Sequence, residues 1–384
     1  MFPIKIEYVL ILITTFILSF ILTPLVRFIS FRVGAVDKPN ARRINKTPMP
    51  SAGGLAIFIS FLITTLFLMP KIVTVEHFGL HYFDYIFPVI SACFLIVVVG
   101  YLDDIYELKP RSKMFGIFLA AVIIWYFTKF HFDSFKIPFG GPLIVFDPVL
   151  TFIVTILWII SITNAINLID GLDGLVCGVS TISLLTMAVV SYFFLPIADF
   201  YLTLTILILV AAISGFFPYN SNPAIIYLGD TGALLIGFLI GVLSLQGLKN
   251  STAVAVVTPV IILGVPIIDT LVAIVRRKLS GRPISEADKM HLHHRLLAMG
   301  FTHRGAVLAV YGIAIIFSLI AILLNLSSRL GGILLLIGCV FTIEILIESL
   351  EIWGENRTPL FKIFKFIGNS DYRQRVMSNY ANKK

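Results

Sequence analysis

The chain has 384 residues, of which 58% are hydrophobic and only 13% are charged, and its mean hydropathy is +0.99. Soluble domains are roughly one quarter charged, so this composition excludes a disordered chain, a coiled coil and an ordinary nucleic-acid-binding protein. The net charge is +8, from 29 Lys and Arg against 21 Asp and Glu. We predict a polytopic membrane protein.

Apolar runs of spanning length recur along the whole sequence. A transmembrane helix needs about 20 apolar residues, and about eleven runs meet that length. They cover residues 8–28, 52–70, 86–102, 114–130, 149–166, 174–195, 201–217, 232–247, 253–275, 305–325 and 330–352. In the first run the basic residues Arg27 and Arg32 follow the apolar stretch, which favours a span over a cleaved signal. We expect one all-α membrane domain over residues 1–384, with a long inner loop at 276–304 and a basic tail at 353–384.

The connections between the runs divide into two classes by charge. Four segments, residues 27–46, 103–113, 276–304 and 357–384, carry 23 of the 29 Lys and Arg. Because Lys- and Arg-rich connections face the cytoplasm, we place the N-terminus outside and the C-terminus inside. The outer loop at 131–148 has prolines, a Gly-Gly pair and short alternating stretches, which predict a small periplasmic β-hairpin.

Acidic and amide residues gather at or just beyond the inner ends of the third, fifth and seventh runs. They are Asp103 and Asp104; Asn164, Asn167, Asp170 and Asp173; and Asn220, Tyr227 and Asp230. Carboxylates near the hydrocarbon boundary are costly and usually functional, so these clusters predict a site that faces the cytoplasm. Two structural alternatives stay open, a solvated helix end for the Asp pair and a helix N-cap for Asp230.

The long inner loop ends in His291, His293 and His294, between Arg282 and Arg295. No cysteine or His-Glu-x-x-His pattern accompanies these histidines, which disfavours a zinc site. Such a group is better suited to donating hydrogen bonds to phosphate or sugar oxygens. A basic surface that faces lipid headgroups is the alternative.

Three further polar residues complete the candidates. Lys46, beside the Pro- and Gly-rich bend before the second run, and Lys113, shortly after the Asp pair, are candidate phosphate-binding lysines. Asp269 lies inside the ninth run, where a functional site and a buried hydrogen-bond acceptor are equally good interpretations.

Taken in order, the motifs resemble the polyprenyl-phosphate N-acetylhexosamine-1-phosphate transferases of glycosyltransferase family 4. The resemblance covers residues 30–310 and rests on five motifs: KTPMPSAGG from Lys46, the Asp pair at 103–104, NAINLIDGLDG at 164–174, YLGDTG at 227–232 and HLHH at 291–294. It implies an integral membrane enzyme that moves a sugar 1-phosphate from a UDP-sugar to undecaprenyl phosphate and releases UMP. It also implies Mg²⁺ or Mn²⁺ as a cofactor.

The resemblance assigns roles to individual residues. Asp230 matches the metal-binding aspartate of the family, and Asp103 and Asp104 match its catalytic pair and are further metal candidates. Asn167, Asp170 and Asp173 match the nucleotide pocket, with Tyr227 where an aromatic ring stacks on uracil. The other candidate substrate-binding residues are Lys46, Lys113, Asn164, Asn220, Arg282, His291, His293, His294 and Arg295.

Substrate choice within the family depends on the histidine motif. The branch that uses UDP-MurNAc-pentapeptide has three consecutive histidines followed by Phe-Glu, whereas this sequence has His-Leu-His-His-Arg. This difference favours transfer of GlcNAc-1-phosphate from UDP-GlcNAc to undecaprenyl phosphate, the first step of a cell-envelope polysaccharide. The MurNAc-pentapeptide transferase is the alternative enzyme. A transporter of anionic lipids is the alternative class, but it would need ionisable groups near the midplane and on both sides of it.

The expected surroundings of the protein follow from this interpretation. Its partners would be UDP-GlcNAc, undecaprenyl phosphate and membrane lipids, with no nucleic acid and with homodimerisation left open. Its place would be the bacterial cytoplasmic (inner) membrane, with the active site on the cytoplasmic face.

Overall fold

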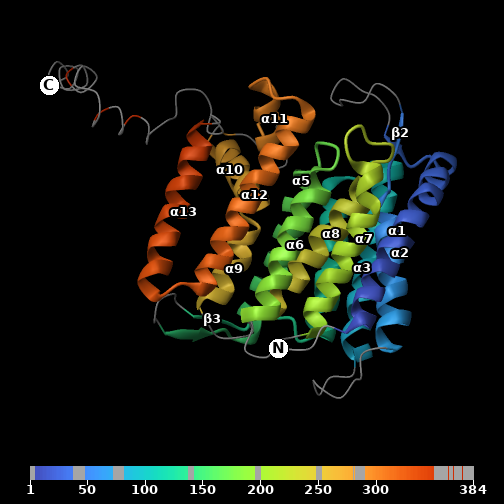
Figure 1. Cartoon of the computed structure of the whole chain (residues 1–384), viewed down its shortest axis with the longest axis horizontal. Coiled ribbons are helices and arrows are strands. Elements are labelled where there is room, and N and C mark those ends of the chain that lie inside the picture. The colour runs from blue at the N-terminus through green and yellow to red at the C-terminus, as the bar shows by residue number, and fades with distance from the viewer. Residues whose placement is uncertain are drawn as a thin grey trace.

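A computed structural model of the chain describes residues 5–37, 48–71, 82–136, 142–194, 200–247, 253–279, 281 and 290–349, and the single residues 362, 366 and 374. Its helices stand side by side in one bundle, with the N-terminus and β3 at one end and α11 and β2 at the other (Figure 1). Within the described part, eight helices are long and apolar enough to cross a membrane, and the stretches 54–68 and 229–245 are shorter apolar helices. The expected all-α, multi-pass membrane architecture is confirmed.

The helices follow the expected apolar runs. They are α1 (Ile6–Val33), α2 (Gly54–Ile63), α3 (Tyr82–Tyr106), α4 (Pro110–Phe127), α5 (Pro148–Leu168), α6 (Leu175–Phe194), α7 (Phe200–Asn220), α8 (Gly229–Gly247), α9 (Ala253–Ile262), α10 (Gly264–Leu279), α11 (Leu292–Ala298), α12 (His303–Leu326) and α13 (Arg329–Ser349). A π-helical turn at Thr64–Leu68 and a 3₁₀ turn at Met69–Lys71 extend α2. The number of spans and their orientation in a membrane stay predictions.

The ninth apolar run is two helices where the sequence predicted a single span. The chain turns at Leu263, between α9 and α10. Pro266, in the first turn of α10, has no N–H group to donate back along the helix. The Ile267 N–H donates to the Leu263 carbonyl at 3.0 Å, so regular helical bonding resumes directly after the proline.

Two short hairpins lie at opposite ends of the bundle. Strands β3 (Ser134–Lys136) and β4 (Leu143–Val145) pair antiparallel, with Ser134 opposite Val145, so the hairpin predicted in the loop 131–148 is confirmed. It lies at the end that carries the N-terminus (Figure 1). Strands β1 (Val36–Asp37) and β2 (Met49–Pro50) also pair antiparallel and bring the start of α2 to the other end of the bundle.

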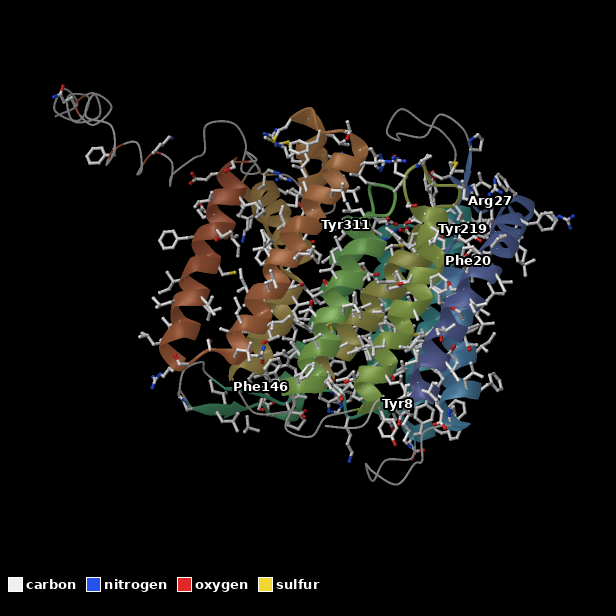
Figure 2. All side chains as sticks on the ribbon, viewed as in Figure 1. Tyr8, Phe20, Arg27, Phe146, Tyr219 and Tyr311 are labelled. Carbon is white, nitrogen blue, oxygen red and sulfur yellow. The ribbon has the colours of Figure 1, made fainter. Side chains whose placement is uncertain are left out.

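Helix α1 shows how the bundle faces its surroundings. Its large apolar side chains, among them Ile13 and Phe16, are exposed, whereas Thr15, Ser19 and Thr23 are buried. The Ser19 hydroxyl donates to the Ala212 carbonyl of α7 at 2.6 Å, and Figure 2 shows Phe20 and Tyr219 of the same two helices beside each other. Small polar residues inside and apolar residues outside are typical of packed helices in lipid.

Helix α8 is the centre of the bundle. All of its residues from 231 to 245 are buried, and glycines on its neighbours let their backbones approach it closely. A Cβ at Gly54 of α2 would lie 2.2 Å from the Gly232 Cα atom, and a Cβ at Gly100 of α3 would lie 2.6 Å from the Thr231 Cα atom. These close approaches bring the N-terminus of α8 against the ends of α2 and α3, where the polar motifs meet.

We expect Gly54→Ala to destabilise the protein, because the added methyl group meets backbone atoms that cannot rotate away. Overpacking of this kind costs about 1–3 kcal/mol, measurable as a lower midpoint of thermal unfolding in detergent. Gly338→Ala is the matched control, since nothing lies within 4 Å of a Cβ at that position in α13. It should leave stability unchanged or raise it by about 0.5–1 kcal/mol. Equal midpoints for both variants would contradict this packing.

Candidate active site

A cavity of about 800 Å³ lies where α3, α4, α8, the loop after α5 and α11 meet. Its volume suits a small-molecule or cofactor ligand. Nine residues that the sequence predicted for the site line it: Asp103, Asp104, Lys113, Asp170, Asp173, Asn220, Tyr227, Asp230 and His294. The fold brings these residues together from positions up to 191 apart in the sequence.

The centre of the cavity is an ion-pair network around Lys113. Its Nζ atom lies 2.9 Å from Asp103 Oδ2 and 2.7 Å from Asp230 Oδ2. The other oxygen of Asp103 accepts from the Leu108 N–H at 2.7 Å, and the other oxygen of Asp230 accepts from Asn167 Nδ2 at 2.6 Å. Both carboxylates are therefore fixed in orientation at the point where α3, α4, α5 and α8 meet.

Asp104 has a different environment from its neighbour Asp103. It accepts hydrogen bonds from Ser51 Oγ at 2.9 Å and from the backbone N–H groups of Asp230 and Thr231, each at 3.0 Å. The Thr231 hydroxyl donates to it as well. Asp104 thus caps the N-terminus of α8 from a neighbouring helix, which a carboxylate does well because it accepts from N–H groups without an intrahelical partner. The alternative that Asp230 is itself the N-cap is wrong.

The loop after α5 supplies a further carboxylate, which is half-buried in the cavity wall. Helix α5 ends at Leu168, as the glycines of the NAINLIDGLDG motif suggested, and the chain turns at 169–174. Burial and the nearby charges of Asp230, Asp104 and Asp173 raise the pKa of Asp170 to about 8. Asp170 is therefore mostly protonated at pH 7.

Neighbouring segments hold this loop in place. Asp173 Oδ2 accepts from Asn222 Nδ2 at 2.9 Å and from the Ala224 N–H at 3.1 Å. The Gly174 N–H donates to Asn220 Oδ1 at 3.1 Å, and the Tyr311 hydroxyl donates to the Gly174 carbonyl at 2.6 Å. Figure 2 labels Tyr311 on α12, at the α11 end of that helix. The loop is thus anchored from α7, from the segment after it and from α12.

Several predicted residues do not line the cavity. Asn164 faces away from it and donates to the Ile160 carbonyl and to Met114 Sδ. His291 is buried against Asp269, at 2.8 Å. Arg295 is outside the cavity wall as well, and Lys46 and Arg282 lie outside the described residues.

His293 is close to the cavity but behind its wall. A Cβ at Gly171 would lie 2.2 Å from His293 Nε2, so the imidazole packs directly against the loop after α5. Burial, with a smaller effect of His294, lowers the pKa of His293 to about 3. His293 is therefore neutral at pH 7.

The cavity also contains residues that sequence reasoning missed. They are Asp37, Ser51, Glu107, Asn222 and His303. Ser51 stands inside the predicted KTPMPSAGG motif, and Asn222 belongs to the Asn-Pro pair of a turn signal, so both had local signals. The other three carry no pattern that distinguishes them from ordinary residues at helix ends.

The donor set fits a hard divalent cation. Within the described part of the chain, the cavity is lined by one lysine and seven carboxylates: Asp37, Asp103, Asp104, Glu107, Asp170, Asp173 and Asp230. No group of three or more His, Cys, Asp or Glu among these described residues is arranged around one metal position. Mg²⁺ needs only one or two carboxylates, because phosphate oxygens and water complete its coordination.

Comparison with known proteins places the chain in a family. The sequence profile of glycosyl transferase family 4 matches residues 86–248. A Bacillus subtilis protein named "Probable undecaprenyl-phosphate N-acetylglucosaminyl 1-phosphate transferase" is 38% identical over 346 residues, covering 90% of this chain and 92% of that protein. A decaprenyl-phosphate N-acetylglucosaminephosphotransferase of Mycolicibacterium smegmatis is 33% identical over 79% of both chains.

A more distant relative belongs to the alternative branch. The phospho-N-acetylmuramoyl-pentapeptide-transferase of Staphylococcus epidermidis is 28% identical over 75% of this chain and 89% of that protein. The 38% identical relative is thus matched both more strongly and over more of the chain. The chain belongs to glycosyl transferase family 4, in the branch of the polyprenyl-phosphate N-acetylglucosamine-1-phosphate transferases.

Proposed function

We propose that this protein transfers GlcNAc-1-phosphate from UDP-GlcNAc to undecaprenyl phosphate, giving undecaprenyl-diphospho-GlcNAc and UMP. The observation that carries the proposal is the gathering of Asp103, Lys113, Asp170 and Asp230 in one cavity. All five motifs that mark the family contribute a residue to that cavity. The product would begin a cell-envelope polysaccharide.

The proposed step is an in-line displacement at phosphorus. An oxygen of the lipid phosphate attacks the β-phosphorus of UDP-GlcNAc, the bond from that phosphorus to the oxygen bridging it to UMP breaks, and UMP leaves. Such reactions depend mainly on alignment and charge neutralisation. Lys113 can stabilise the charge that develops on the phosphate oxygens, and Asp103 and Asp230, both ion-paired to it, hold it in place. Tyr227 and Asp173 would bind the nucleotide.

A direct displacement needs no aspartyl-phosphate intermediate. Asp103 already uses both oxygens, one toward Leu108 and one toward Lys113, which favours a positioning role over a nucleophilic one. Trapping a radiolabelled phospho-sugar on Asp103 or Asp104 in the absence of lipid would exclude the direct route.

Mg²⁺ is the proposed cofactor, with Mn²⁺ as its substitute. Asp230 and Asp103 are the carboxylates that would hold it, because Oδ2 of each is bound to the Lys113 side chain, whereas Asp104 caps the N-terminus of α8. When bound, the cation supplies charge neutralisation to the diphosphate. Neutralisation matters here because both substrates are anionic and the described residues that line the cavity include seven acids.

We place the cavity on the cytoplasmic side of the bacterial inner membrane. The cavity is at the bundle end that carries β2 and α11, away from the N-terminus (Figure 1). That end joins the segments richest in Lys and Arg, which supports a cytoplasmic orientation.

Release of UMP by the purified protein tests the proposal. We expect UMP from UDP-GlcNAc only when undecaprenyl phosphate and Mg²⁺ are both present, and no UMP after chelation by EDTA. UDP-GalNAc and UDP-MurNAc-pentapeptide serve as competing donors in the same assay. Faster turnover of the pentapeptide donor would move the protein to the alternative branch, and UMP release without lipid would exclude the transfer to undecaprenyl phosphate.

A further inference from the structure

Asp269 is a buried carboxylate that the proposed reaction does not use. It lies in the second turn of α10, is 4% exposed and is absent from the wall of the active-site cavity. Its near surroundings are apolar, with Val265, Ile268 and Phe317 around a small void beside it. Burying a carboxylate in such a place costs several kcal/mol of folding free energy unless hydrogen bonds compensate for the lost hydration. The hydrogen-bond partners of Asp269 therefore indicate its role.

Both oxygens of Asp269 are bonded to the beginning of α11. Oδ2 lies 2.8 Å from His291 Nδ1, and Oδ1 accepts from the Leu292 N–H at 2.8 Å. His291 is the residue before α11 and makes no side-chain cap bond of its own. Two bonds to adjacent residues fix the start of this short helix and also the rotation of the imidazole ring.

A continuous set of contacts leads from this pair to the cavity. The ring of His291 is nearly parallel to that of His293, with 6.1 Å between centroids and 4° between planes. The rings of His293 and His294 are 4.2 Å apart, and His293 Nε2 packs on Gly171. Gly171 and His294 line the cavity, so the position of Asp269 determines how the histidine segment meets that wall.

The pair also selects the tautomer of His291. A carboxylate oxygen without a proton can only accept a hydrogen bond, so the contact between Oδ2 and Nδ1 favours a proton on Nδ1. In the tautomer that carries its single proton there, Nε2 can accept a hydrogen bond. Carboxylates orient metal-binding histidines in the same way from outside the coordination sphere.

We infer that Asp269 is a positioning residue for the sugar nucleotide: it holds His291 in one orientation and one tautomer and, through α11, seats the histidine segment against the loop after α5. This inference rests on the proposed function, because it assigns that segment to the UDP-sugar and not to the lipid. It gives a reason for an acidic residue to lie within an apolar part of α10.

Steady-state kinetics of Asp269→Asn show which of the two substrates depends on Asp269. The amide keeps the shape but loses the charge and one acceptor, so we expect the KM for UDP-GlcNAc and the Kd for UDP to rise about tenfold. The KM for undecaprenyl phosphate should stay unchanged. Thr258→Val is the matched control, because it removes a different buried bond between helices, from Asn325 Nδ2 at 3.0 Å. Thr258→Val should change neither KM. An equal rise of both KM values in Asp269→Asn would mean that Asp269 has only a structural role.

The tautomer of His291 can be measured independently of enzymatic activity. In ¹⁵N spectra of protein labelled at histidine, the His291 signals are assigned by their loss in His291→Gln. We expect Nδ1 to be protonated and Nε2 to be unprotonated in the unaltered protein, and a mixture of both tautomers in Asp269→Asn. An Nε2-protonated His291 in the unaltered protein would overturn the inference. Failure of UDP-GlcNAc turnover together with the expected tautomer would overturn the proposed function instead.

Discussion

Replacing Asp230 by asparagine is expected to lower kcat for GlcNAc-1-phosphate transfer about a thousandfold, because it removes a charge at the centre of the cavity. Asp230 contacts both Lys113 and Asn167, and asparagine has the same shape, so the bundle should still form. The variant should also need more Mg²⁺ for half-maximal rate, since one proposed cation ligand is weakened. Steady-state rates across a Mg²⁺ titration measure both effects.

Asn164→Leu is the control for this substitution. Asn164 belongs to the same polar motif but faces Met114 and the Ile160 carbonyl, away from the cavity. Its replacement should change kcat by less than about threefold. Normal activity of Asp230→Asn with an unchanged Mg²⁺ requirement would remove Asp230 from the cation site, whatever the control does.

The different placement of these two residues shows what the sequence could predict. Hydropathy and the basic residues predicted that the motifs share one end of a helical bundle, and the cavity there contains Asp103, Asp170 and Asp230. The rotation of each helix could not be predicted in the same way. Asn164 precedes Asn167 by three positions, which is about 60° short of a full helical turn, and packing of α5 against α8 decides which of the two reaches Asp230.

Contacts between residues far apart in the sequence could not be predicted either. The interpretation of Asp269 stayed open because nothing local indicates that a carboxylate in α10 bonds to His291, 22 positions later. The split of the ninth apolar run is similar, since prolines within a hydrophobic stretch are compatible with a kinked span or with two helices. Both features depend on tertiary packing, which periodicity does not report.

The charge distribution connects the fold to the proposed chemistry. Helix α8 brings its N-terminus, where unpaired N–H groups favour negative charge, into a cavity lined by seven carboxylates. One of those carboxylates, Asp104, is used to satisfy that helix end, and two more are paired with Lys113. These pairings leave Asp103 and Asp230 together beside the N-terminus of α8, where a bound divalent cation would neutralise the charge of two phosphate-bearing substrates.

The adjacent residues Asp103 and Asp104 should therefore respond differently to the same substitution. Asp103→Asn should lower kcat about a hundredfold with little change in thermal stability, because Asp103 orients Lys113 and is a proposed cation ligand. Asp104→Asn should also lower the free energy of unfolding by about 2–3 kcal/mol. Asp104 accepts from the Asp230 N–H and the Thr231 N–H with separate oxygens, so the amide NH₂ group that replaces one oxygen leaves one of these two N–H groups without its acceptor.

Thermal unfolding in detergent, measured beside turnover, distinguishes the two variants. The comparison is controlled internally, since the residues are neighbours on α3 and the chemical change is identical. Equal midpoints with equal losses of activity would mean that Asp104 acts on the substrate as Asp103 does. A lower midpoint for Asp104→Asn alone would instead show that the two residues have different roles. Asp103 would orient Lys113, and Asp104 would hold the end of α8 that carries Asp230.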